Sequence, residues 1–325
     1  MNKGWFLATG LTLALLSNSV TSRACATCGC TLNSDWASQG FAFGRGFHLD
    51  FRYDYFDQDQ LRSGAGRVAL SDIRFPSGRE IQLQTINRNL TFDMGYSPDP
   101  NWQFDVLLPT YDRTHSTVAP GDTAPSYSRS AGIGDAQIQM RWQGLLRDHS
   151  LGFQFGIKLP TGRFHDTFRS GPQAGEPVDR GLQLGTGTTD VLLGLYKFGF
   201  MGESWGYFAQ GSVQVALASR DGFRPGDVLN ASAGLRYSAS ERVTPQIQLN
   251  IVAQKPERGI NADTQNSGAT AAYLSPGLSV RVGQRFYLFA FVQLPVYQRV
   301  DGYQIMPRSL FTAGLHYRFY TERHK

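Results

Sequence analysis

The sequence predicts an all-β fold, a single closed antiparallel up-and-down transmembrane β-barrel of about 12 strands. Three observations indicate it: an export-type N-terminus, about a dozen segments in which apolar and polar residues alternate, and connections that alternate between short and long. The 325 residues are 41% hydrophobic and 18% charged, which excludes a disordered chain. After the first twenty residues, no apolar run reaches the roughly 18 residues that a membrane-spanning helix needs.

The N-terminus has the pattern of a secretory signal peptide, which we assign to residues 1–24. Lys3 is followed by an apolar run from Trp5 to Leu16 and by small residues up to Ala24. The competing interpretation, a membrane anchor, needs a longer run. Cleavage removes two basic residues, so the net charge falls from +5 to +3. That charge is small and scattered, and we therefore expect no nucleic-acid partner.

The mature chain then begins with a cysteine-containing segment, residues 25–45, which we expect in the periplasm as a plug or docking segment. Cys25, Cys28 and Cys30 could supply three thiolates to a soft metal ion. In an oxidising periplasm, two of them would instead form a disulfide, and this is the favoured interpretation. Lipid modification of Cys25 is a third, weaker alternative. We expect no cofactor.

The alternating segments span residues 46–320, and residues 321–325 form a C-terminal tail. In the first segment Phe47, Leu49 and Phe51 alternate with polar residues, and residues 311–319 repeat the pattern. The regular segments between them lie near residues 103–108, 137–143, 151–159, 207–217, 229–237, 246–251 and 278–282. Less regular ones lie at 81–96, 189–200 and 286–296.

The connections decide between a soluble sandwich and a membrane barrel. The short ones are predicted at residues 97–101, 146–149, 201–204, 238–242 and 282–285. The long ones are predicted at residues 58–79, 113–130, 162–182, 219–226, 255–268 and 297–308. Tight turns at one end and long loops at the other are typical of outer-membrane barrels, with the turns in the periplasm. A soluble sandwich explains the strands but not this distribution. We therefore expect the chain in the outer membrane of a Gram-negative-type bacterium.

In such a barrel, the apolar residues of each alternating segment face lipid and the polar residues between them face the lumen. The predicted lumen-lining residues are Asp50, Arg52, Asp54, Asn87, Asn89, Asp93, Asp105, Gln139, Arg141, Lys158, Gln214, Arg236, Gln248, Asn250, Arg281, His316 and Arg318. These side chains would form either a narrow polar path or a salt-bridged, mostly filled interior, and the sequence leaves both open.

Two motifs suggest enzymes, and neither has the structural context that it needs. GESWG around Ser204 matches a nucleophile elbow, but it falls in a tight turn with no helix after it. GAGRVA at residues 64–69 resembles a dinucleotide-binding loop but lacks the βαβ unit. We expect no catalytic residues and no enzymatic activity.

Several strings between residues 131 and 320 resemble a known family. They are AGIGDAQIQMRW, LGFQFGIKLPTGR, QLGTGTTDVLLGLYKF, AYLSPGLSVRV, FVQLPVYQRVDG and LFTAGLHYRF. They look like the meta-pathway phenol-degradation family of outer-membrane β-barrel transporters. The resemblance implies a barrel that passes small, often hydrophobic, molecules and has no catalytic residues. Pro109, Pro160 and Pro295 are expected to end outward-running strands, where pairing stops.

These observations lead us to expect an outer-membrane channel for the passive passage of small, aromatic or hydrophobic, molecules. Its expected partners are outer-membrane lipid, the small-molecule solute and, through the C-terminal strand, the barrel-assembly machinery. Two alternatives stay open. One is a barrel that positions the cysteine cluster for periplasmic metal or redox chemistry, and the other is a structural surface barrel with a closed lumen.

Overall fold

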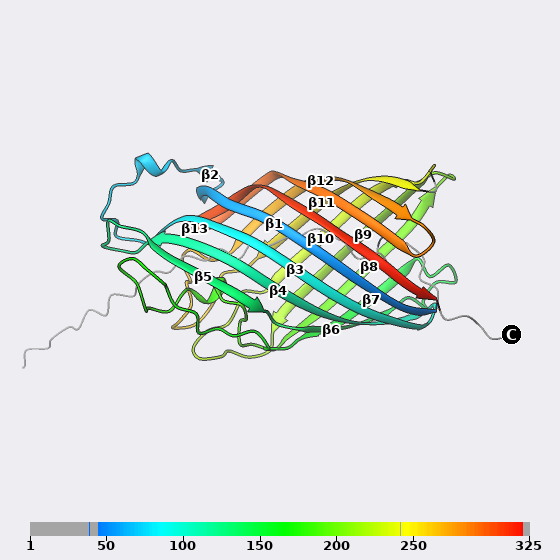
Figure 1. Cartoon of the computed structure of the whole chain (residues 1–325), viewed down its shortest axis with the longest axis horizontal. Coiled ribbons are helices and arrows are strands. Elements are labelled where there is room, and N and C mark those ends of the chain that lie inside the picture. The colour runs from blue at the N-terminus through cyan, green and yellow to red at the C-terminus, as the bar shows by residue number, and fades with distance from the viewer. Residues whose placement is uncertain (1–38, 40–44, 241, 321–325) are drawn as a thin grey trace, which may run out of the picture.

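The computed structural model describes residue 39, residues 45–240 and residues 242–320. Its described part is one antiparallel sheet rolled into a tilted barrel (Figure 1). The strands are β1 (Gly46–Gly64), β2 (Gly66–Arg67), β3 (Ile81–Asp99), β4 (Trp102–Val118), β5 (Ser126–Ile133), β6 (Gln137–Trp142), β7 (Leu151–Lys158), β8 (Asp190–Met201), β9 (Trp205–Ala216), β10 (Val228–Tyr237), β11 (Val243–Gln254), β12 (Ala269–Val282) and β13 (Phe286–Tyr320).

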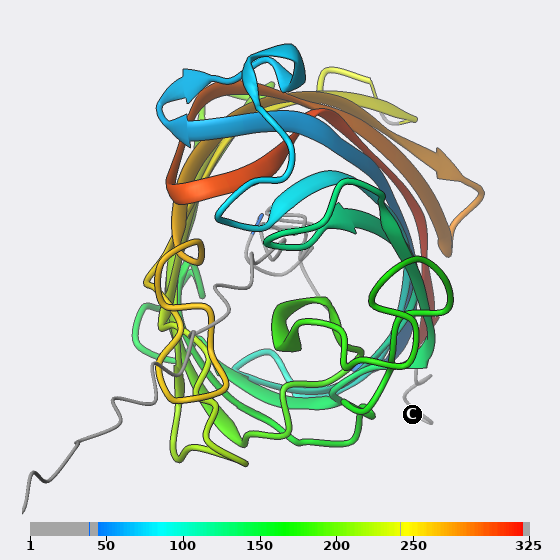
Figure 2. The ribbon, with the colours of Figure 1, turned by 90° about the vertical axis from the view of Figure 1, so that its left-hand side faces the viewer.

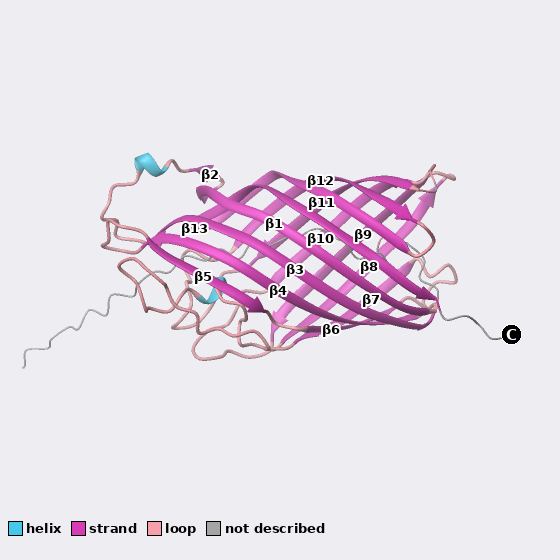
Figure 3. Ribbon diagram, in the orientation of Figure 1, coloured by secondary structure: helices cyan, strands magenta, loops and turns pink. Residues whose placement is uncertain are grey.

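Helix is nearly absent from this part of the chain. Two 3-10 turns, η1 (Leu70–Asp72) and η2 (Arg180–Leu182), lie in loops (Figure 3). Among the described residues, no helix combines the length and the apolar character needed to cross a membrane.

The sheet closes because its first and last strands pair. Gly46 of β1 lies opposite Tyr320 of β13, and the antiparallel ladder continues through Phe56 and Leu310. The strand order β13-β12-β11-β10-β9-β8-β7-β6-β4-β3-β1 therefore forms a ring, which Figure 2 shows end-on. β2 pairs with β1, and β5 pairs with β4, outside that ring. The predicted closed antiparallel barrel is confirmed.

The long strand β13 is folded back on itself at Asp301 and Gly302, and Gly302 has a φ of +65°. Residues 286–300 pair with β12, whereas most of residues 303–320 pair with β1. The two arms also lie side by side, because the Phe286 and Tyr317 ring centroids are 4.4 Å apart. The Arg318 amide donates to the carbonyl of Arg285, just before the first arm, at 3.1 Å. The ring has eleven strands, and because β13 supplies two arms, the wall consists of twelve antiparallel segments. An even number is what a fully antiparallel ring requires, and it agrees with the predicted count of about 12 strands.

The connections follow the predicted division, with corrections at the loop-bearing end. The predicted loop 297–308 is wrong, because strand β13 runs through it and reverses in two residues. The predicted loops 58–79 and 113–130 are too long, because β1 and β4 extend beyond the membrane-length segments and β5 occupies part of the second. The tight turns between consecutive strands, at the right in Figure 1, lie at the same end as Gly46 and Tyr320.

Two of the three prolines do not end strands. Pro160 follows the end of β7, as expected. Pro109 lies inside β4, where that strand changes partner from β6 to β5, and its carbonyl accepts a bond from the Gly134 amide at 2.8 Å. Pro295 lies inside β13, beside a register shift in the ladder with β12. Proline lacks an N–H to donate, so interruptions of the ladder accommodate it as well as strand ends do.

The outer surface of the barrel is apolar. Leu90, Met94 and Val106, on neighbouring strands, are 44%, 47% and 44% exposed. Near the tight turns, aromatic rings pair across adjacent strands, with centroids 4.5 Å apart for Phe47 and Tyr96 and 4.9 Å apart for Trp205 and Tyr237. An apolar wall with an aromatic girdle is what contact with lipid requires.

The interior also has an apolar part that the sequence analysis did not predict. Beside the buried Phe56, side chains from β11, β12 and β13 form a cluster that includes Tyr273, Val300, Met306 and Leu310. Val300 and Met306 belong to the segment that had been assigned to a loop. One side of the lumen is therefore apolar at its loop-bearing end.

Candidate functional site

The side chains of the predicted lumen-lining residues all lie on the face of their strands opposite to the lipid-facing side chains. The buried ones are Asp54, Asn87, Asn89, Asp105, Gln139, Arg141, Lys158, Arg236, Gln248, Asn250 and His316. The half-buried ones are Asp50, Arg52, Asp93, Gln214, Arg281 and Arg318. These residues do not form one site, because they lie at different heights along the barrel axis. Ionic networks occur at two of these levels, one near the long loops and one near the tight turns.

The network at the loop-bearing level is centred on Lys158, at the end of β7. Its ammonium nitrogen lies 3.0 Å from the Asp135 carboxylate and 3.1 Å from the Asp190 carboxylate. Gln214 donates to Asp190 at 2.6 Å, and the Thr188 hydroxyl donates to its other oxygen at 2.7 Å. The ionic side chains are almost fully buried, so each charge depends on these partners.

Asp135, one of these two aspartates, also fastens segment 159–189 inside the barrel. One oxygen of Asp135 accepts the Gly162 amide and the other accepts the Thr186 amide, each at 3.0 Å. Gly162 and Gly185 pack backbone to backbone, and a Cβ at Gly162 would lie 2.8 Å from the Gly185 Cα. Figure 2 shows this green segment entering the ring of strands. Three of the family-like strings therefore meet at one point.

A cavity of about 320 Å³ lies in the lumen beside this fastened segment. One part of its lining is polar and includes Arg113, Lys158 and Asp190. Another part is apolar: Phe56 belongs to the inner apolar cluster and Val228 packs against that cluster. The cavity, which we call the lumen chamber, can therefore contact a polar group and an apolar group of the same molecule.

Arg180 of η2 contributes a cation to the lumen chamber. Its guanidinium carbon lies 4.0 Å from the centroid of the Phe164 ring and 5.0 Å from that of Phe223, and Nη2 donates to the Thr186 carbonyl at 2.8 Å. Its Nε atom is buried without a hydrogen-bond partner. Aromatic faces stabilise a guanidinium without satisfying its donors, so part of the hydrogen-bonding capacity of this cation is unused.

At the rim of the lumen chamber, Asp227 joins two outer loops. Its carboxylate lies 3.1 Å from Lys255 and 3.2 Å from Arg258. The hydrogen bond from Lys255 holds the pKa of the Asp227 carboxyl below its ordinary value. The rim is therefore held by charge as well as by the strand ladder.

The second ionic network lies near the tight turns. Asp105 accepts hydrogen bonds from Arg141 at 2.7 Å and from Gln103 at 2.8 Å, and the Nε2 atom of His48 lies 3.2 Å away. Asp50, on β1, contacts the His316 Nδ1 atom at 2.6 Å.

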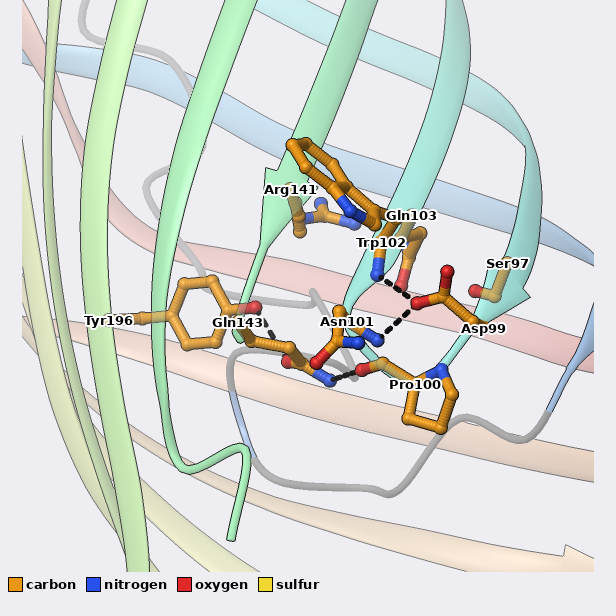
Figure 4. Close-up of a pocket in the computed structure, with 9 residues that line it drawn as sticks. All are labelled: Ser97, Asp99, Pro100, Asn101, Trp102, Gln103, Arg141, Gln143 and Tyr196. Carbon is orange, nitrogen blue, oxygen red and sulfur yellow. Dashed lines mark hydrogen bonds between the residues drawn. The ribbon is translucent and has the colours of Figure 1, made fainter. Parts of the chain in front are cut away.

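Figure 4 shows how tightly the neighbouring turns are held together. The Tyr196 hydroxyl donates to Gln143, Gln143 donates to the Pro100 carbonyl, each at 2.8 Å, and Asp99 accepts the Asn101 amide at 2.7 Å. The pocket between these side chains holds only about 10 Å³. It is too small for a solute, so the lumen chamber is the better candidate.

Several residues of the lumen chamber were missed from the sequence. Asp135, Thr186 and Asp190 occur in the strings GIGD and GTGTTD, which were noted for their resemblance and not for their chemistry. Arg113 and Arg180 fell in segments assigned to loops. A search for acids and threonines beside strand ends would have found the first three.

The N-terminal predictions fall mostly outside the described residues. This applies to Cys25, Cys28 and Cys30, to the signal peptide 1–24 and to the tail 321–325, which stay predictions. Within the expected segment 25–45, Gln39 is described and buried, and its carbonyl accepts a hydrogen bond from Arg236.

Comparison with known proteins bears on the fold. No family model matches the sequence, and no curated protein matches it. The COG4313 outer membrane channel from Pseudomonas putida F1 has a similar structure, with a TM-score of 0.62 and 12% identity, covering 85% of this chain and 96% of that one. The chain has an outer-membrane β-barrel fold. The CymD monoaromatic hydrocarbon channel matches with a TM-score of 0.47 and 9% identity, covering 92% of this chain and 95% of its own.

Fold and surface together give the location. A closed barrel with an apolar outside and an aromatic girdle is stable where its outer face meets hydrocarbon. The predicted outer-membrane location is confirmed. The resemblance to the phenol-degradation family stays a prediction, since no family model matches.

Proposed function

We propose that this chain is an outer-membrane channel that lets small amphipathic molecules, aromatic ones among them, cross passively. The observation that carries the proposal is the lumen chamber, a cavity of about 320 Å³ inside the ring with one apolar and one polar side. A solute that buries an apolar part against Phe56 and Val228 keeps its polar part bonded to Arg113 or Arg180. Such a path binds briefly and releases, as passive conduction requires.

Two further features support a channel rather than an enzyme. The buried ions of the loop-bearing level are paired with one another, as in the Lys158 network, which suits them to shape a path. A protein of similar structure, from Pseudomonas putida F1, is an outer membrane channel. We also propose that the C-terminal arm of β13, which completes the ring against β1, is the segment that the barrel-assembly machinery receives.

The test uses one inward and one outward position on adjacent residues of β3. Thr91 lines the lumen chamber, whereas Leu90 is exposed on the lipid side. Liposomes containing the purified barrel should admit small aromatic alcohols and acids. Thr91→Trp should lower the rate of entry because the new ring fills part of the chamber. Leu90→Trp, the matched control, should leave the rate unchanged.

The outcomes separate the alternatives. A barrel that admits no solute from a panel of aromatic acids, sugars and fatty acids is a structural barrel, and the proposal fails. Equal entry rates for the two tryptophan variants would mean that solutes do not pass through the lumen chamber.

A further inference from the structure

Near the tight turns, three ionisable side chains stand in one row across adjacent strands. His316 of β13 lies directly opposite Asp50 of β1, and Asp50 lies directly opposite Asp93 of β3. Like charges directly opposite each other in a ladder are destabilising. The pairing of Asp50 with Asp93 inside a barrel is therefore a position where a cation stabilises the fold.

A histidine nitrogen completes this group. His48 is 4% exposed, and its Nε2 atom lies 3.6 Å from an Asp50 oxygen. Ligand atoms of His48, Asp50 and Asp93 all lie within 4.8 Å of one another. A separation of 3.6 Å is long for a hydrogen bond. It fits two ligands of one ion, because ligands about 2.1 Å from a tetrahedral zinc stand roughly 3.4 Å apart.

The second oxygen of Asp50 is hydrogen-bonded to His316, and Arg318 determines the tautomer of that histidine. Arg318 Nε can only donate, and it lies 3.0 Å from the His316 Nε2 atom. His316 Nε2 is therefore the acceptor, and its Nδ1–H donates to Asp50 at 2.6 Å. An imidazole that orients a carboxylate ligand in this way is the usual outer support of a metal site.

His48 can turn to an ion without leaving its present partner unpaired. Asp105 keeps its bonds from Arg141 and Gln103 when the His48 nitrogen is withdrawn. The His48 ring occupies the volume that a side chain on Gly95 would fill, since a Cβ there would overlap the ring and the Asp105 carboxylate. The glycine therefore makes room for the imidazole between β1 and β4.

We propose that His48, Asp50 and Asp93 bind one divalent transition-metal ion of the zinc type, with His316 as a positioning residue. One imidazole and two carboxylates suit a borderline ion, and its two positive charges match the two carboxylates. This site is separate from the lumen chamber and does not depend on the proposed channel function. Its proposed ligands do not include Cys25, Cys28 or Cys30.

The test titrates Co²⁺ into the purified barrel in which those three cysteines are replaced by serine, and follows its visible absorption. About one Co²⁺ per barrel should bind, and Zn²⁺ should displace it. His316→Gln should weaken the affinity by about 10- to 100-fold, as expected for an outer-shell residue. His48→Gln and Asp93→Asn should weaken it more. His165→Gln, at an exposed residue, and Asp112→Asn, at a half-buried residue outside the proposed site, are controls and should bind as the parent does.

Heat-modifiable migration on a gel checks that each variant is a closed barrel. If Asp93→Asn does not fold, His48→Gln decides. The proposal is overturned if the closed cysteine-free barrel binds no Co²⁺, or if a closed His48→Gln variant binds it as tightly as the parent. Displacement by Ca²⁺ would overturn the assigned chemistry, because that ion requires more oxygen ligands.

Discussion

The ammonium group of Lys158 lies 3.0 Å from Asp135, and the same carboxylate accepts the backbone amides of Gly162 and Thr186. One aspartate thus links a barrel strand to the segment folded into the lumen. The shape of the lumen chamber and the stability of the wall consequently depend on the same few atoms.

Replacing Lys158 with methionine should destabilise the barrel strongly. The change leaves the Asp135 and Asp190 carboxylates buried without their shared cation, a loss of about 3–5 kcal/mol for a broken buried pair. Urea unfolding followed by tryptophan fluorescence measures it. Lys255→Met removes an exposed pair with Asp227 and should cost at most about 1 kcal/mol. Equal losses for the two variants would contradict the central role of Lys158.

Gly185→Ala should narrow the path. A Cβ at residue 185 would overlap the Gly162 carbonyl and the Asp135 carboxylate, so segment 159–189 must move off the wall toward the barrel axis. Single-channel conductance in planar bilayers should fall. Gly78→Ala, where a Cβ meets no atom within 4 Å, should leave it unchanged. An unchanged conductance in Gly185→Ala would show that this segment does not limit the path.

Gly302→Ala tests the reversal inside β13. An alanine at a φ of +65° costs about 1–2 kcal/mol. Its Cβ would also overlap the Asn266 side chain. Gly283 has a φ of +75° but open space around it. Gly302→Ala should therefore lower the urea midpoint more than Gly283→Ala does, and the reverse order would argue against a tight reversal at this position.

Acid should loosen the rim at Asp227. Because the pKa of this carboxyl is lowered in the folded barrel, its contribution is fully present above the ordinary value of 3.8. It is lost as the pH falls from that value through the lowered one. Pepsin cleavage of loops 217–227 and 255–268, relative to Asp227→Asn, should rise as the pH falls from about 5 to about 2. A constant ratio would show that the pair does not hold the rim.

Most of the fold was predictable because lipid imposes a strict period of two on each strand. Phe47 and Asp50 lie on the expected sides, and most turns lie where the alternation breaks. The reversal at Asp301 and Gly302 was missed although Asp-Gly is a strong turn signal. The flanking segment 297–308 does not alternate cleanly, since Ile305, Met306 and Pro307 are all buried.

The lumen chamber was predictable only in part. Lys158 was assigned to the interior because of its place in the apolar–polar alternation. Its partner Asp135 lies in the break between β5 and β6, where the chain is not a strand and alternation does not predict which way a side chain faces. The contact of Gly162 with Gly185 depends on how a long loop folds back, which local spacing does not encode. Sequence pattern therefore indicated which side chains face inward but not which of them meet.

The seam between Gly46 and Tyr320 has a consequence for biogenesis. Because β13 closes the ring against β1, every strand between them is made and delivered before closure is possible. Until then both boundary strands, β1 and the final arm of β13, present unpaired backbone to whatever surrounds them. A chain without the second arm of β13 could not close the barrel at all. Periplasmic chaperones and proteases would then encounter an open sheet rather than a slightly narrower barrel.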